Sequence, residues 1–352
     1  MIDTGEAIRK LTLNLARYSG IAPLTRPFFG GVGAILMLHR VTAQPIPPNS
    51  VNRHLTVDPA FLDELIADMK RSGYVFLSLD EVCERLAVGD FRQRFATITA
   101  DDGYRDNLIE ALPVFEKHST PFTIYVAPAL INRAVDLWWM VAENVVDARD
   151  VLRVPTASGT ATLDCSTPAR KFEANSWLHT FLTTAVREED QRQVLRDLAR
   201  SVGVDPEAPA RETLMNWDEL RRIAAHPLAA IGAHSVNHYS LSRLPESKAA
   251  REIADCAGIL EIEIGARPRH MAYPYGYAGA AGCREVALAA KAGFVSAVTT
   301  RHGVLQSAHS GHMHALPRIS VNGRYQRIGH MRTMLSGVTT PLANAGKMVV
   351  TV

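Results

Sequence analysis

The sequence predicts an α/β protein built on a parallel sheet, either closed or open. Short apolar runs recur along the chain, and most are separated by segments with helical patterns, which is the order of elements in parallel-sheet proteins. The expected strands are Gly33–Val41, Phe95–Thr99, Phe122–Val126, Ala229–Ala233, Met271–Tyr273 and Phe294–Thr299. The length of 352 residues suggests about two domains, although single α/β barrels of roughly 200–250 residues are common.

Helix-capping signals mark the first helices between these strands. Asp58 and Pro59 supply an N-cap and a first-turn proline for a helix that stops at Gly73. Ser78 and Glu81 have the spacing of a capping box, which opens a second helix. Further helices are expected at Asn107–Lys117, Glu246–Ile264 and Glu285–Ala292.

The composition excludes several classes of protein. Hydrophobic residues make up 47% and charged residues 21%, which is typical of a globular protein and excludes a disordered chain. The formal net charge is only +2, so nucleic acid is not expected as the main partner. No apolar run is long enough to predict a membrane-spanning helix. The cysteines are far apart without a Cys-x-x-Cys pair, which favours a reducing compartment over a disulfide framework or a cysteine-ligated zinc site.

The two ends of the chain are expected to lie outside the main domain. Residues 1–30 form an N-terminal arm that carries Asp3 and Glu6 and lacks the apolar core of a secretory signal, so the expected location is the cytoplasm. The arm is either a helix packed on the domain or a basic amphipathic segment in peripheral contact with a membrane. The tail 336–352 is rich in Gly, Thr, Pro and Ala, and we expect it to be weakly structured.

One segment interrupts the alternation of strands and helices. Residues 129–211 have little strand character, with a loop expected around 155–167 and a charged helical stretch near 187–200. An insertion in a loop of a barrel explains this segment best, because such loops meet the substrate at the carboxyl ends of the strands. Its paired Trp138 and Trp139 either form a platform on which a sugar stacks or pack in the core of the insertion.

Two polar motifs directly follow expected strands. Asp101 and Asp102 follow the strand that ends at Thr99, and Gly103 allows a sharp turn that brings both carboxylates into one pocket. His234 and His238 follow the strand that ends at Ala233, and their spacing suits two imidazoles on one divalent ion. Each motif alone is weak evidence. Together they predict an open metal site with three protein ligands, of the kind that activates water, and a spare carboxylate beside it as base.

The same motifs resemble a known family. Asp101-Asp102-Gly103-Tyr104 with His234-Ser235-x-x-His238 is similar to the polysaccharide deacetylases, which carry the NodB-homology domain of carbohydrate esterase family four. Ala272-Tyr273-Pro274-Tyr275-Gly276 and Leu316-Pro317-Arg318-Ile319 extend the resemblance, which runs from about Gly31 to Val321. It implies a deformed (β/α) barrel of about seven strands over 31–335, with the mainly helical insertion at about 129–211.

The resemblance also assigns roles to single residues. It makes Asp101 the general base and Asp102, His234 and His238 the ligands of a divalent metal, zinc first and cobalt or nickel as alternatives. The backbone N–H of Tyr275 would stabilise the oxyanion. Leu316 would line the pocket for the acetyl methyl group.

This chain departs from the family pattern in the machinery that delivers the proton. Arg318 stands where the family carries an acid histidine, and an arginine binds charge, for instance on a substrate, but does not donate a proton. Ala272 stands where the family carries an arginine that pairs with the base. Three residues are considered as replacements for that arginine: Arg105, Arg267 and Arg269. The leaving amine would be protonated by His39, by one of His309, His312 and His314, or by Asp101 after it has acted as base. The route through Asp101 is preferred at this point because it needs no further residue.

The sequence therefore predicts a hydrolase of non-peptide carbon–nitrogen bonds. A metal-activated water would remove N-acetyl groups from an N-acetylglucosamine-type oligosaccharide or polysaccharide precursor, in the manner of the NodB-type chitooligosaccharide deacetylases. Two alternatives stay open. One is a degenerate barrel that binds glycan without catalysis, and the other is a hydrolase of a non-sugar amide.

Overall fold

The computed structural model describes residues 13–14, 28–46 and 50–352. Most of the arm expected at residues 1–30 lies outside these described residues. None of the helices in the described ranges is long and apolar enough to cross a membrane.

A closed parallel barrel of seven strands forms the centre of the molecule, as the resemblance implied. Its strands, in the order in which they pair, are β1 (Gly33–Leu38), β12 (Leu316–Ser320), β11 (Ser296–His302), β10 (His270–Ala272), β9 (Ala229–Ala233), β6 (Phe122–Val126) and β5 (Phe95–Ala100). The barrel closes where β1 pairs with β5 from Gly33 opposite Phe95 to Leu38 opposite Ala100. A short strand, β4 (Val75–Phe76), pairs with the outside of β5. Parallel pairing places the carboxyl ends of all these strands at one end of the barrel.

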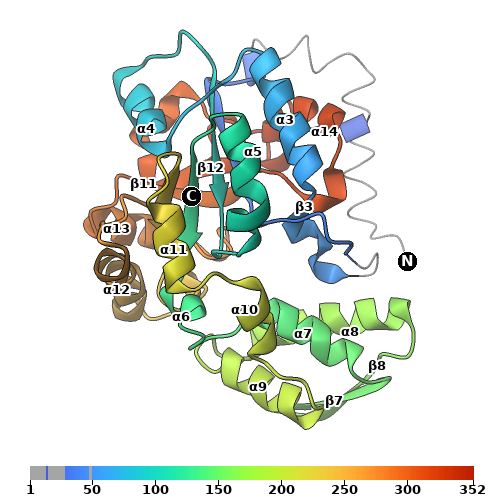
Figure 1. The fold of residues 1–352 in the computed structure, drawn as a ribbon. Coiled ribbons are helices and arrows are strands. Elements are labelled where there is room, and N and C mark those ends of the chain that lie inside the picture. Colours follow the sequence, from blue (N-terminus) through green and yellow to red (C-terminus); the bar gives the residue numbers. More distant parts are fainter. Residues whose placement is uncertain (1–12, 15–27, 47–49) are drawn as a thin grey trace.

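Helices cover the outside of the barrel (Figure 1). They are α3 (Pro59–Arg71), α4 (Leu79–Val88), a π-helical turn η2 (Asn107–Ala111) that continues into α5 (Leu112–Lys117), α11 (Trp217–Ala224), α12 (Glu246–Ile264) and α13 (Cys283–Lys291). The capping signals read from the sequence are present. The side chain of Asp58 accepts hydrogen bonds from Ala60 and Phe61 at the start of α3. Ser78 and Glu81 form the capping box of α4.

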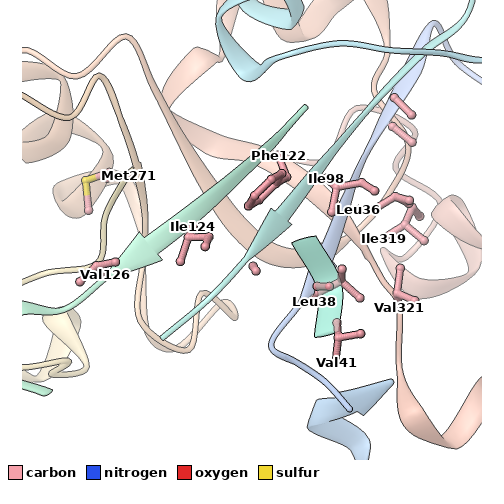
Figure 2. Close-up of a cluster of buried hydrophobic side chains, with 14 of the residues drawn as sticks. Leu36, Leu38, Val41, Ile98, Phe122, Ile124, Val126, Met271, Ile319 and Val321 are labelled. Carbon is pink, nitrogen blue, oxygen red and sulfur yellow. The ribbon is translucent and has the colours of Figure 1, made fainter. Parts of the chain in front are cut away.

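Both faces of most barrel strands are buried, and β9, whose first three residues are partly exposed, is the main exception. Figure 2 shows part of the outer layer, in which side chains such as Leu36, Ile98 and Ile124 face the surrounding helices. The alternate residues of the same strands point into the barrel, where Ile35, Leu316 and their neighbours form a second apolar layer. Because both faces pack, the strands read as nearly continuous apolar runs in the sequence.

The insertion is a small helical lobe with its own core. It comprises α6 (Pro128–Ile131), α7 (Trp138–Asp147), β7 (Val151–Thr156), β8 (Gly159–Asp164), α8 (Pro168–Thr180), a π-helical turn η3 (Phe181–Ala185), α9 (Gln191–Ser201) and α10 (Ala208–Thr213). The prediction of a loop around residues 155–167 is wrong, because β7 and β8 pair there in an antiparallel hairpin. Leu152 and Val154 alternate with exposed residues along β7 and bury themselves against the helices of the lobe.

The C-terminal segment is more ordered than the sequence suggested. A helix, α14 (Ile328–Leu335), is followed within the expected tail by α15 (Thr339–Ala343). Thr340 is completely buried, and Val350 is only 3% exposed. The side chain of the buried His309 lies 3.1 Å from the carbonyl oxygen of Val350, which ties the end of the chain to the barrel.

Short elements complete the structure of the described residues. They are β2 (Arg40–Val41), η1 (Val51–Leu55), β3 (Thr56–Val57), η4 (Leu241–Arg243), η5 (Ser307–Gly311), η6 (Met313–Ala315) and η7 (Gly323–Tyr325). β2 and β3 pair in parallel beside the barrel. This pairing places η1 close to the carboxyl end of β1.

Candidate active site

The polar residues singled out in the sequence meet at the carboxyl end of the barrel. His39 follows β1, Asp101 and Asp102 follow β5, and the segment from His234 to His238 follows β9. Tyr275 lies in the turn after β10. Four strands therefore bring together residues that are far apart in the sequence.

Asp102, His234 and His238 form a buried cluster that could hold a metal ion. One potential ligand atom of each residue lies within 4.8 Å of the others. Asp102 Oδ1 is 3.5 Å from His234 Nε2 and 3.2 Å from His238 Nε2. This carboxylate oxygen is buried and makes no hydrogen bond to any described residue. An unpartnered carboxylate oxygen facing two imidazole nitrogens is the donor set that a divalent ion with one open position requires.

The surroundings of the cluster favour its role as a ligand set. His234 Nδ1 lies 2.8 Å from the carbonyl oxygen of Ala272, which orients the ring so that Nε2 faces Asp102. Burial alone would raise the pKa of Asp102, but the two imidazoles outweigh burial and hold that pKa below its ordinary value. Asp102 is therefore a carboxylate, the form that binds a cation.

Backbone conformations that side chains rarely adopt are concentrated at this site. Asp102, Ser235, His238 and Tyr275 all have positive φ angles, between 52° and 74°. Such angles cost energy in residues with a side chain and tend to occur at functional sites. The turn at Tyr275 is followed by Gly276, where a Cβ atom would lie only 2.6 Å from the backbone nitrogen of Thr300. The local sequence thus fixes the site geometry at some cost in stability.

Asp101 is held by a buried arginine that comes from β12, which only β1 separates from β5 in the barrel. Arg318 Nη1 and Nη2 donate hydrogen bonds to the two carboxylate oxygens of Asp101 at 2.7 and 2.8 Å. Arg318 also donates through Nε to the carbonyl oxygen of Thr299 at 2.8 Å and through Nη1 to the hydroxyl of Thr99 at 3.1 Å. Burial alone would raise the pKa of Asp101, but the charge and hydrogen bonds of Arg318 outweigh burial and keep this pKa below its ordinary value.

Arg318 therefore makes the pairing with Asp101 that the family resemblance assigned to an arginine at position 272, where this chain has Ala272. The side chain of Arg318 is completely inaccessible to solvent and lies over the ring of Tyr125, inside the barrel. It is not in the cavity where the sequence placed it as a substrate-binding residue. The replacements considered from the sequence pair elsewhere: Arg105 with Glu219, Arg267 with Glu261 and Arg269 with Asp80.

His39 is the histidine that the structure brings to Asp101. Its Nε2 lies 3.9 Å from Asp101 Oδ2, and its side chain is 21% exposed. The other candidate histidines, His309, His312 and His314, lie outside the cavity, whereas Asp101 lines it. His309 faces the carbonyl oxygen of Val350, and His314 Nε2 lies 2.7 Å from the carbonyl oxygen of Phe294.

A cavity of about 1180 Å³ opens over the cluster. Its walls come from the barrel, η1, the insertion, η7 and the C-terminal helices. His54 on η1 also faces this cavity, a residue that the sequence gave no reason to select. Leu316 does not reach the cavity, because it lies two residues before Arg318 on the inward face of β12, one layer deeper in the barrel.

Trp138 and Trp139 line the cavity and also anchor the insertion to the site. Trp138 Nε1 donates to the hydroxyl of Tyr275 at 2.8 Å, and Trp139 Nε1 donates to the hydroxyl of Tyr104 at 3.1 Å. The ring of Trp139 lies 5.2 Å from the ring of His238. The pair thus forms a wall beside the cluster of Asp102, His234 and His238, with Trp138 itself almost fully buried.

Charged residues of the insertion hold the segment that carries His238. Arg192, on α9, donates from Nη2 to the carbonyl oxygen of His238 at 3.1 Å. Glu188 accepts hydrogen bonds from the backbone of Ser240 and from Arg243. The sequence showed only a charged helical stretch here, because its pattern does not distinguish a buried arginine from a solvated one.

Comparisons with known proteins agree with this architecture. A family model described as "Polysaccharide deacetylase" matches residues 89–295. No curated protein matches the chain. The fold is similar to that of a Streptococcus pyogenes deacetylase, PplD, solved in complex with acetate, at 18% identity and a TM-score of 0.56 over 86% of this chain and 97% of the other.

Two further solved structures have similar folds. IcaB from Ammonifex degensii matches at 16% identity and a TM-score of 0.52, over 86% of this chain and 97% of the other. A de-N-acetylase from Aggregatibacter actinomycetemcomitans matches at 12% identity and a TM-score of 0.52, over 86% and 99%. Because the family model covers more than half of the sequence, the chain belongs to the polysaccharide deacetylase family.

Proposed function

We propose that this protein is a metal-dependent hydrolase that removes N-acetyl groups from an N-acetylglucosamine-type oligosaccharide or polysaccharide precursor. One observation carries the proposal. Two adjacent carboxylates point to the same cavity, one paired with an arginine and the other facing two histidines with an unpartnered oxygen. That arrangement separates a base from a metal ligand, which is what hydrolysis of an unreactive amide needs.

Asp102, His234 and His238 would hold the metal. A divalent ion there would polarise the amide carbonyl and lower the pKa of a water molecule, to about 7 for zinc in favourable sites. Zinc suits a set of two imidazoles and one carboxylate, and cobalt or nickel are the alternatives.

Asp101 would accept the proton from the attacking water. The fork of Arg318 holds both carboxylate oxygens in place and keeps the group ionised, so Asp101 is ready to act as base. The backbone N–H of Tyr275 would share the negative charge that develops on the amide oxygen. Thr300 supports this turn, because its hydroxyl donates to the carbonyl oxygen of Tyr275 at 2.6 Å and its N–H donates to that of Gly276.

His39 would protonate the leaving amine. It faces the cavity beside Asp101, and an imidazole nitrogen can carry the proton that the amine receives. The proton taken up by Asp101 then returns to His39 across the 3.9 Å that separates the two groups. In this route the proton that the amine receives from His39 is replaced by the one that Asp101 took from water. Arg318 takes no part in proton transfer and stays paired with Asp101.

Acetate release by the purified protein tests the proposal. We expect release from N-acetylglucosamine oligomers in the presence of zinc or cobalt, and none from formamides or cyclic imides under the same conditions. Hydrolysis of a non-sugar amide alone would contradict the substrate class. Oligomer binding without release of acetate from any oligomer would contradict the enzymatic function and indicate a binding module.

A further inference from the structure

One face of helix α8, in the insertion, lines the active-site cavity. Five residues of this helix, at helical spacing, contribute to the wall: Phe172, Asn175, Ser176, His179 and Thr180. Residues three or four positions apart lie on one face of a helix, so these side chains form a continuous strip. We call them the α8 face.

The α8 face differs in character from the side of the same helix that packs inward. Ala174 and Leu178 are nearly or fully buried in the apolar core of the insertion. Toward the cavity, the helix presents an aromatic ring, an amide, an imidazole and two hydroxyls, and the last three of these five residues are exposed. A helix whose only task was to pack against the barrel would present apolar residues there.

Contacts between rings connect the α8 face to the metal cluster. The ring of His179 lies 5.1 Å from that of Trp138, and Trp138 donates a hydrogen bond to Tyr275. The ring of Tyr275 lies 5.0 Å from that of His238. The face is therefore adjacent to the reaction site without taking part in the metal cluster, and it lies within reach of a chain whose acetamido group is at that cluster.

The chemistry of the α8 face suits an uncharged, hydroxyl-rich ligand. It carries no carboxylate, lysine or arginine, and desolvation lowers the pKa of His179, so the imidazole is neutral at neutral pH. The hydroxyls of Ser176 and Thr180 donate to carbonyl oxygens of their own helix, which leaves their lone pairs to accept hydrogen bonds from sugar hydroxyls. The neutral imidazole of His179 can both donate and accept. The ring of Phe172 adds an apolar surface of the kind found in ligand sites.

We propose that the α8 face is a subsite for a neighbouring sugar of a glycan chain, so that the enzyme prefers oligomers to the single acetylated sugar. The assignment rests on the proposed function, because it takes the ligand to be a saccharide. It adds a residue set that determines chain-length preference and gives the insertion a role in substrate recognition.

The test combines binding and turnover in the full-length protein. The variant is S176A/H179A/T180A, which alters three exposed positions and introduces a good helix former at each. The matched control is Glu173→Ala, an exposed residue of α8 outside the cavity. Calorimetry on chelator-treated protein measures the Kd of the N-acetylglucosamine tetramer. With zinc restored, acetate release gives kcat/KM for the tetramer and for the shortest oligomer that the wild type accepts.

We expect the triple variant to bind the tetramer about tenfold or more weakly than the wild type, the effect of losing one or two hydrogen bonds. Its kcat/KM should fall for the tetramer and stay within about twofold for the shortest substrate, and the control should match the wild type. An unchanged tetramer Kd, an equal loss on short and long substrates, or a wild type that does not bind the tetramer would each overturn the subsite. Tetramer binding that depends on the α8 face without acetate release would support the subsite and refute the proposed enzymatic function.

Discussion

Asp101 and Asp102 are consecutive residues that are each only 2% exposed, yet the protein neutralises them in different ways. Asp101 has a permanent internal cation, because Arg318 binds both of its oxygens. Asp102 faces two imidazoles and keeps one buried oxygen without a hydrogen bond to the described residues. The two imidazoles hold Asp102 ionised, and the oxygen that faces them would be the one that binds a cation in the proposed metal site.

The contrast between the two carboxylates corresponds to the two proposed tasks, accepting a proton and binding a metal. The arginine fork engages both oxygens of Asp101, which suits this carboxylate to the proposed role of base. The neighbouring carboxylate, turned the other way by its positive φ, joins the histidines. One backbone turn thus gives two identical side chains two different tasks.

Exchanging each carboxylate for its amide provides the strongest test of this contrast. Asp101→Asn should lower kcat by about 10³, within the range found for removal of a general base, while metal content stays that of the wild type. Asp102→Asn should instead lose bound metal on dialysis, and activity with it. Metal content and acetate release are measured on both variants. Equal loss of metal in the two would contradict the assignment of Asp102, and not Asp101, as the metal ligand.

Removing the internal cation should cost the most stability. Arg318→Leu leaves Asp101 buried and unpaired, which is expected to destabilise the fold by about 3–5 kcal/mol in denaturant titration. Arg318→Lys keeps the charge but loses the fork, so its loss should be smaller.

The pairing of Arg318 with Asp101 is expected to affect how stability and kcat/KM depend on pH. Arg318 lowers the pKa of Asp101, so the pair stabilises the folded state above the ordinary carboxyl pKa and loses this contribution as pH falls through the lowered value. In Arg318→Lys the pKa should rise, and the acid limb of kcat/KM should move to higher pH. An acid limb that stays in place would show that Arg318 does not tune the base.

His54, unlike Asp101 and Asp102, is a titratable group of the cavity that the folded protein keeps uncharged at neutral pH. Burial lowers its pKa to about 4, and the largest opposing effect is the hydrogen bond to the carbonyl oxygen of Val51. The unfolded chain therefore binds a proton before the folded protein does, and stability falls as pH drops from about 6.5 toward 4. His54→Gln should reduce this loss by about 2 kcal/mol. Unfolding at pH 7 and pH 4.5 measures it, and parallel losses in both proteins would contradict the assignment.

Arg192 is a second buried arginine near the site, and unlike Arg318 it is not paired with a carboxylate of the cluster. Its Nε and Nη1 have no hydrogen-bond partner among the described residues, while Nη2 holds the carbonyl oxygen of His238. We expect Arg192→Leu to weaken zinc binding by about tenfold, the lower end for groups that support metal ligands. Stability should change little, because an apolar side chain avoids the cost of burying a charge and this offsets the lost contacts with the ring of Tyr239 and the carbonyl oxygen of His238. Arg200→Leu, an exposed position on the same helix, is the control, and equal zinc affinity in all three proteins would exclude a positioning role.

The sequence predicted the parallel sheet and the central cluster because both leave local signals, whereas closure into a barrel was implied by the family resemblance. Strands buried on two faces are apolar runs, and the ligands and the base directly follow two of them. The role of Arg318 left no such signal, because its partner Asp101 lies 217 positions away and the family pattern places the arginine on another strand. A cavity-facing helix such as α8 resembles a solvated helix in sequence, since both carry polar residues on one face. The order of the C-terminal segment likewise depends on contacts with distant elements.

Removal and return of the metal tests the central claim most directly. Acetate release from the N-acetylglucosamine tetramer would be measured on the purified protein, after chelation, and after zinc is added back, with Asp102→Asn treated in parallel. We predict that chelation abolishes release, that zinc restores it in the wild type, and that the same zinc concentration does not restore it in Asp102→Asn. Release that continues after complete removal of metal, or that Asp102→Asn retains, would contradict the assignment of Asp102, His234 and His238 as the metal site.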